Sequence, residues 1–124
     1  MRTFTIDGRS VQSFADFVTV TNVGFIEQVG GRWNGNLDAL NDYLSWPHEE
    51  HYRLELIGAE NCALRLGHAA YAVWLSECLG TCHPSNIADV RSQLARAEAG
   101  EGETLFDIIR DIIFDSEQVQ LVLR

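Results

Sequence analysis

A tight loop that leads directly into an amphipathic helix is encoded by Arg32-Trp33-Asn34-Gly35-Asn36-Leu37-Asp38-Ala39-Leu40-Asn41-Asp42-Tyr43-Leu44-Ser45-Trp46. Asn36 suits the N-cap position, because its side-chain oxygen can accept a hydrogen bond from a free amide of the first turn. Four apolar residues then recur at helical spacing and predict one buried stripe. They are Leu37, Leu40, Tyr43 and Leu44. We expect the helix to run from Asn36 to Trp46 and to end at Pro47, which cannot donate the next backbone hydrogen bond.

Two aspartates share the other face of this predicted helix. Asp38 and Asp42 are four residues apart, which places their Cβ atoms about 5–6 Å from each other. No Lys or Arg lies within a turn of them on the helix, and like charges so placed destabilise a helix by about 0.2–0.5 kcal/mol. The helix dipole offsets this effect at Asp38 but not at Asp42. The pair can be part of an ordinary solvated helix surface, or it can bind positively charged groups of another molecule.

This segment resembles the barstar family, the intracellular inhibitors of barnase-type ribonucleases. The resemblance is carried by Asn36-Leu37-Asp38-Ala39-Leu40, then Asp42 and Leu44, and by Trp33 and Gly35 in the preceding loop. The two ends of the chain are similar to the family too. Phe4-Thr5-Ile6-Asp7-Gly8 and Ser13-Phe14-Ala15-Asp16-Phe17 resemble its first strand, turn and helix, and residues 104–123 resemble its last helix and strand. Roughly 1–60 and 103–124 are covered, whereas 60–102 is longer than in the family.

The resemblance implies a fold. It is an α/β single domain over residues 1–124, with a small three-stranded parallel sheet covered by helices and an expanded helical segment at about 60–102. It also implies a function, inhibition of a cationic ribonuclease or nuclease toxin by occlusion of its active site, as an immunity protein does in a toxin–antitoxin pair. Asp42 would enter that active site in place of an RNA phosphate, with Asp38 beside it. Two positions depart from the family, which carries Tyr where this chain has Arg32 and Trp where it has Asn41.

The predicted partner-binding residues lie in the loop, on the helix that follows it and on the last helix. They are Trp33, Asn34, Gly35, Asn36, Asp38, Asn41, Asp42, Ser45, Trp46 and Asp111. Trp33 is expected to be the aromatic anchor, since amphipathic aromatic residues are frequent at interface centres; the alternative is packing over the start of the helix. Trp46 suits either the core or the rim of the interface.

Three aspartates recur every four residues in the predicted last helix. Asp107 follows Thr104 by three residues, which is the spacing of a capping box. Asp111 corresponds to the acidic residue that the last helix of the family contributes to its interface. Asp115 lies near the end of the helix, where the helix dipole disfavours a negative charge.

Composition limits the class of partner. The chain has 124 residues, enough for one domain, and its net charge of −9 comes from nine Arg, no Lys and eighteen acidic residues. This excess makes nucleic acid and anionic membranes poor partners and suits a cationic protein. Met1-Arg2-Thr3-Phe4-Thr5 lacks the apolar core of a signal peptide, so we expect a cytoplasmic protein. We also expect a monomer that binds its partner 1:1.

Other classes of function are less well supported by the sequence. Asp38 and Asp42 could serve as the acid and base of a hydrolase, but no nucleophile elbow, phosphate loop or metal motif appears elsewhere in the chain. A non-catalytic module for another cationic partner is the closer alternative. Three cysteines, Cys62, Cys78 and Cys82, suit reduced thiols better than a zinc site, which needs four close ligands. We expect no enzyme activity, cofactor or metal.

The remaining elements follow from local patterns. Strands are predicted at 3–6, 52–57 and 119–123, and helices after Ser10 or Ser13, at 59–66, 69–79 and 87–99, and from Thr104 to about Asp115. Strands separated by helices predict parallel pairing through right-handed crossovers. Residues 19–31 give no clear prediction, because β-branched residues and glycines weaken a helix there.

Overall fold

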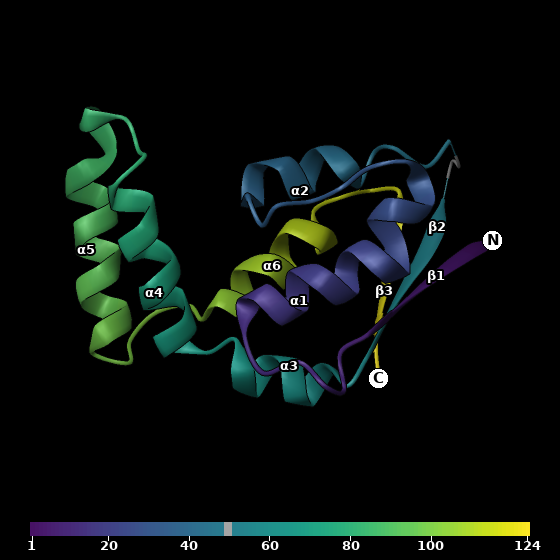
Figure 1. Cartoon of the computed structure of the whole chain (residues 1–124), viewed down its shortest axis with the longest axis horizontal. Helices are drawn as coiled ribbons and strands as arrows, with labels where there is room; N and C mark the ends of the chain where they lie inside the picture. Colours follow the sequence, from purple (N-terminus) through teal and green to yellow (C-terminus); the bar gives the residue numbers. More distant parts are fainter. Residues whose placement is uncertain (49–50) are drawn as a thin grey trace.

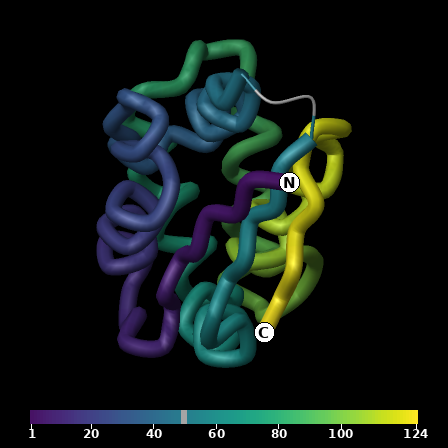
Figure 2. The backbone as a smooth tube through the Cα atoms, turned by 90° about the vertical axis from the view of Figure 1, so that its right-hand side faces the viewer, coloured from purple at the N-terminus to yellow at the C-terminus, as the bar shows by residue number. Residues whose placement is uncertain are grey.

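A three-stranded parallel sheet organises the molecule. The computed structural model describes residues 1–48 and 51–124. Strands β1 (Arg2–Asp7), β2 (Tyr52–Ile57) and β3 (Val119–Leu123) lie side by side in the order β1-β2-β3 (Figure 2). Phe4 pairs with Leu54, and Leu54 with Leu121. The predicted strands and their parallel pairing are therefore confirmed, and the α/β class with them.

The helices cover one face of this sheet. In Figure 1 the strands stand on the right and the labelled helices lie to their left. Alternation along β1 and β2 explains the asymmetry, because Phe4, Ile6 and Leu54 are buried on the helical side while Thr3 and Thr5 are exposed on the other. The helices have the following bounds: α1 (Phe14–Thr21), α2 (Leu37–Tyr43), α3 (Ala59–Arg65), α4 (His68–Leu79), α5 (Ile87–Glu98) and α6 (Leu105–Phe114).

The segment that gave no clear prediction continues α1 in two other helical forms. A π-helical turn η1 (Asn22–Ile26) and a 3-10 turn η2 (Glu27–Val29) follow α1 without a break. The extra residue per turn of a π-helix brings Gly24 against β1, where a Cβ would stand 2.2 Å from the Thr5 carbonyl oxygen. Only glycine permits this close approach. The approach brings the Phe25 ring against that of Phe4, with the two ring centroids 5.0 Å apart.

The helix predicted over 36–46 is shorter than expected. It begins after Asn36, as predicted, but ends at Tyr43 rather than at Pro47. The backbone N–H groups of Ser45 and Trp46 donate to carbonyls three residues back, those of Asp42 and Tyr43, each over 3.1 Å. Tightening of the last turn therefore ends the helix before proline can.

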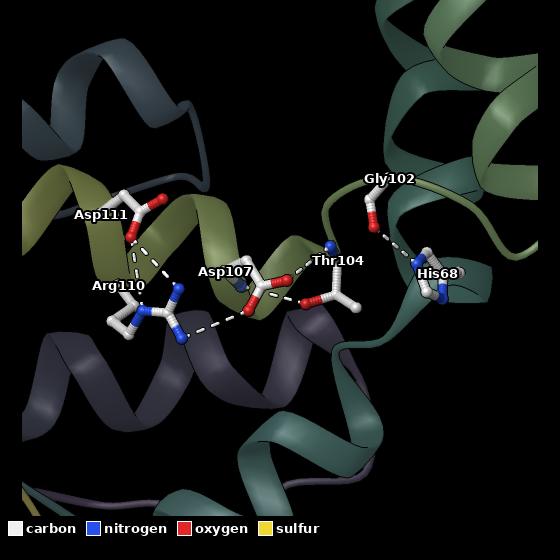
Figure 3. Close-up of polar contacts among 6 residues, drawn as sticks. All are labelled: His68, Gly102, Thr104, Asp107, Arg110 and Asp111. Atoms are coloured by element: carbon white, nitrogen blue, oxygen red, sulfur yellow. Dashed lines mark hydrogen bonds and ion pairs between the residues drawn. The ribbon is translucent and has the colours of Figure 1, made fainter.

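The expanded segment 60–102 consists of α3 and a hairpin of α4 and α5. The predicted helical pieces are confirmed with shifts of one residue at their ends. A short 3-10 turn, η3 (Pro84–Asn86), precedes α5, and the hairpin extends away from the sheet on the far left of Figure 1. Helix α4 packs against α6 of the body, with Tyr71 and Leu75 in the core. The Phe106 N–H donates to the Leu66 carbonyl over 2.8 Å, and His68 Nε2 lies 2.9 Å from the Gly102 carbonyl oxygen (Figure 3).

Helix α6 begins at the predicted capping box. The Asp107 N–H donates to Thr104 Oγ1 over 3.1 Å, and the Thr104 N–H donates to Asp107 Oδ2 over 3.0 Å (Figure 3). Both bonds satisfy backbone amides that a helix otherwise leaves free at its start. The box fixes the position of α6, which lies against α2.

Asp107 should make the stability of the protein depend on pH. Hydrogen bonding from the Thr104 N–H, opposed by partial burial, holds the pKa of the Asp107 carboxyl below its ordinary value of 3.8. The stabilisation is therefore complete above that value and is lost as the pH falls through the folded-state pKa. We expect Asp107→Asn to lower the free energy of unfolding by about 1 kcal/mol at neutral pH, and by much less at strongly acidic pH.

Urea denaturation followed by circular dichroism at neutral and acidic pH measures this difference. Asp111→Asn is the matched control, since Asp111 lies on the same helix but outside the capping box. An equal loss of stability at both pH values for Asp107→Asn would contradict the role of its carboxylate.

Candidate functional site: the acidic face of helix α2

Hydrogen bonds hold the loop before α2 in one conformation. The Asn22 side chain brackets the Trp33 backbone, because its Oδ1 accepts from the Trp33 N–H over 2.7 Å and its Nδ2 donates to the Trp33 carbonyl over 2.8 Å. The Tyr43 hydroxyl donates to the Arg32 carbonyl over 2.8 Å. The loop is thus tied both to η1 and to the helix that it introduces.

Asn36 starts α2 as predicted. Its Oδ1 accepts from the backbone N–H groups of Asp38 and Ala39 over 2.9 and 3.2 Å. Leu37 and Leu40 are buried, as is Leu44 just beyond the helix. The predicted amphipathic helix is confirmed, although Tyr43, expected in the buried stripe, is only half-buried. The stripe leaves the opposite face to solvent.

That solvent face carries three of the predicted binding residues. Asp38, Asn41 and Asp42 are all exposed. In the part of the chain that the structure describes, neither aspartate makes an ion pair. The charge repulsion inferred from their spacing is therefore left uncompensated by the described residues.

The prediction that Trp33 is an exposed aromatic anchor is wrong. The side chain is only 2% exposed, and its Nε1 donates to the Asn36 carbonyl over 2.7 Å. Its ring meets those of Phe14 and Phe17 edge-on, with centroids 5.9 and 6.4 Å away. Trp33 thus packs beneath the start of α2, which is the alternative that the sequence left open.

The other loop positions differ in how much surface they offer. Gly35 is buried, so it presents no surface to a partner, whereas Asn34 and Asn36 are exposed. The Asn34 Oδ1 accepts from the Asn36 N–H over 3.1 Å. These exposed amides flank the acidic face without adding to its charge.

Trp46 is the aromatic residue that the structure leaves accessible at this end of α2. Its side chain is 42% exposed, and its ring packs edge-on against Tyr43 with centroids 4.7 Å apart. Ser45 is exposed as well, and its hydroxyl donates to the Asp42 carbonyl over 2.7 Å. Trp46 therefore suits the rim of a binding face better than the core.

Asp111 stands apart from the aspartates of α2. It is exposed, and its Oδ1 lies 3.3 Å from both Nε and Nη2 of Arg110. Arg110 also pairs with Asp107, over 3.3 Å (Figure 3). One guanidinium thus neutralises part of the charge of both carboxylates, which reduces what Asp111 can offer to a partner.

Asp115, rather than Asp111, lines a hollow together with the aspartates of α2. A hollow of about 530 Å³ opens between α2 and the end of α6, and Asp115 lines it together with Asp38 and Asp42. Leu37, Asn41 and Ile112 complete the lining. The signal for Asp115 was present in the sequence, since a carboxylate at the end of a helix is disfavoured by the dipole and so suggests another role.

The side chains that line the hollow can accept hydrogen bonds and pair with positively charged groups. Among the described residues that line it, three are carboxylates and none is Arg, His, Ser or Cys. In the described ranges 1–48 and 51–124, no three His, Cys, Asp or Glu side chains are grouped so as to hold a metal ion. The arrangement suits binding of guanidinium or ammonium groups.

The start of α2 also lies close to the end of α4. Burial first, and then the charges of Cys82, Glu77 and Asp38, raise the pKa of the Cys78 thiol. Burial, with a smaller effect of Asp7, raises the pKa of the Cys62 thiol to about 11. All three cysteines are free.

Comparison with known proteins found no relative: no family model, no curated protein and no solved structure matches this chain. Membership of the barstar family is therefore a prediction from the sequence motifs. Within residues 1–48 and 51–124, none of the helices combines the length and the apolarity needed to cross a bilayer.

Proposed function

We propose that this protein is a barstar-type ribonuclease inhibitor, an immunity protein that blocks a cationic ribonuclease or nuclease toxin. The observation that carries the proposal is the cluster of Asp38, Asp42 and Asp115 around one open hollow, with no cation among the described residues that line it. Ribonucleases hold RNA phosphates with basic side chains, and carboxylates can occupy the same positions. The resemblance of Asn36-Leu37-Asp38-Ala39-Leu40 to the family supports the same role.

The proposed mechanism is occlusion assisted by long-range attraction. The net charge of −9 draws a cationic partner toward the acidic face and speeds association, an effect that salt screens. The hydrogen bonds that fix the loop before α2 reduce the conformational entropy lost on binding. Asp42 pairs with basic side chains of the toxin, and Trp46 covers the rim.

A non-catalytic module for another cationic protein is the alternative, and the same surface would serve it. A carboxylate-pair hydrolase is less well supported, because Asp38 and Asp42 both face solvent from a single helix. No Ser, Cys or His is among the described residues that line their hollow. The proposed inhibitor is a cytoplasmic monomer, and occlusion of an active site requires no cofactor.

Titration against barnase and a panel of basic microbial ribonucleases tests the proposal. We expect stoichiometric inhibition of at least one enzyme, and we expect Asp42→Asn to weaken it by tenfold or more, because truncated charge pairs at interfaces are worth about 2 kcal/mol or more. Association should also slow as salt is raised.

Glu60→Gln is the matched control for charge removal. Glu60 is exposed in the first turn of α3, at the opposite end of the body from α2 in Figure 1. Equal effects of the two substitutions would reject the acidic face as the binding site. Failure to inhibit any ribonuclease in the panel would leave the alternative module as the better hypothesis.

A further inference from the structure

A second hollow, of about 500 Å³, lies between α1 and α4. Most of its lining is apolar, and one carboxylate lines it. Its apolar residues include Phe14, Val18, Ala70, Val73 and Trp74, and its carboxylate is Glu77. Its size and apolar character match those of protein sites that take up a side chain or a small ligand.

Two helix faces form the walls of this hollow. Phe14 and Val18 are one turn apart on α1, while Val73, Trp74 and Glu77 follow the spacing that places residues on one face of α4. Val73 is 61% exposed, and Trp74 is half-buried with its ring stacked on Tyr71. An exposed apolar face on a helix that packs with its other side against α5 is typical of an interaction surface.

Shared lining residues link the α1–α4 hollow to the acidic face. A third hollow, of about 330 Å³, shares Trp74 with it and shares Leu37 and Asp38 with the hollow between α2 and α6. We call the three together the trough. Carboxylates occur along its whole length, at Glu77, Asp38, Asp42 and Asp115, and none of the described residues that line it is Arg or His.

We propose that the trough binds a segment of the partner protein in which an apolar side chain is flanked by Arg or Lys. The apolar side chain enters the α1–α4 hollow, and the flanking cations pair with Glu77 and Asp38. This inference rests on the proposed function and deepens it, because it makes α4, from the expanded segment, the element that selects one cationic partner among many.

Charge decides against a second copy of this chain as the occupant. Each copy carries a net charge of −9, and a symmetric contact through the trough would bring Glu77, Asp38 and Asp42 of both copies together. Like charges brought together in this way repel each other strongly once water is excluded. A cationic segment relieves the repulsion that already exists along the trough.

Peptide titration followed by the amide signals of the labelled protein tests the proposal. The probe is a capped peptide with the sequence Gly-Arg-Leu-Arg-Gly, compared with peptides that have Ser for Leu or Glu for both Arg. We expect the first peptide to shift the signals of Val18 and Val73 as well as those of Glu77 and Asp38, and to bind more tightly than the other two. Shifts confined to α2, equal for the Leu and Ser peptides, would overturn the proposal.

Val73→Ser is the variant that isolates the apolar contact. We expect it to weaken binding of the Leu peptide by about fivefold, as loss of roughly 40 Å² of buried apolar area implies, without changing that of the Ser peptide. Leu64→Ser is the control, since Leu64 is 75% exposed on α3 and does not line the trough. Equal effects of the two variants would reject the role of α4.

The ribonuclease titration separates this inference from the proposed function. Inhibition that Asp42→Asn weakens and Val73→Ser leaves unchanged would overturn the role of α4 and leave the inhibitor function standing. Selective binding of the Leu peptide without inhibition of any ribonuclease would support the trough and reject the ribonuclease as its partner. Equal binding of the Glu-containing peptide would mark a general apolar site and overturn the assignment of a cationic segment.

Discussion

Replacement of Trp33 by alanine is expected to lower the free energy of unfolding by about 3–5 kcal/mol, the range for truncation of a large buried aromatic side chain. The indole is 2% exposed and contacts the rings of Phe14 and Phe17. Its Nε1 also donates to the Asn36 carbonyl, so the substitution leaves that carbonyl without the bond. Urea denaturation of the purified variant measures the loss.

Trp46→Ala is the matched control, because Trp46 is 42% exposed and sits at the other end of α2. We expect it to lower stability by less than about 1 kcal/mol, as surface substitutions do. If Trp33→Ala kept the stability of the unmodified protein and lost only the ability to bind its partner, Trp33 would be an interface anchor after all.

Asn22→Ala is expected to lower the free energy of unfolding by about 2–4 kcal/mol. The Asn22 side chain is the partner of both the N–H and the carbonyl of Trp33, and each buried backbone group left unsatisfied costs about 1–3 kcal/mol. The loop before α2 would lose its connection to η1, so affinity for a partner of the acidic face should fall as well.

Gln28→Ala provides the control for this loss. Gln28 also donates to backbone carbonyls, those of Val23 and Gly24, but its side chain lies at the surface. We expect an effect below about 1 kcal/mol there. If Asn22→Ala had as small an effect, the bracket around Trp33 would not be what fixes the loop.

Stability and binding are coupled through this loop. Asn22 and Trp33 contribute no exposed charge, yet they set the direction in which α2 leaves the core and so the positions of Asp38 and Asp42. Asn22 binds the backbone of residue 33, which Trp33→Ala retains, so the two substitutions remove different contacts of the same loop. The acidic face therefore depends on buried residues that no partner touches.

The sequence by itself determined the features that depend on near neighbours along the chain. Ser13, Asn36 and Thr104 cap α1, α2 and α6, because an N-cap needs only a side-chain oxygen two or three residues before a free amide. The strands and the parallel sheet followed from alternation and from the helices between strands. Exposure of Asp38 and Asp42 followed from helical spacing against Leu37 and Leu40.

Only the tertiary structure decided which side chains the fold brings together from distant segments. Burial of Trp33 depends on Asn22 and on the rings of α1, and local spacing carries no information about either. That Asp115, and not Asp111, lies beside the aspartates of α2 depends on how α6 packs against α2. The trough exists because α4 lies across from α1, and that placement is set by long-range packing that no single helical pattern contains.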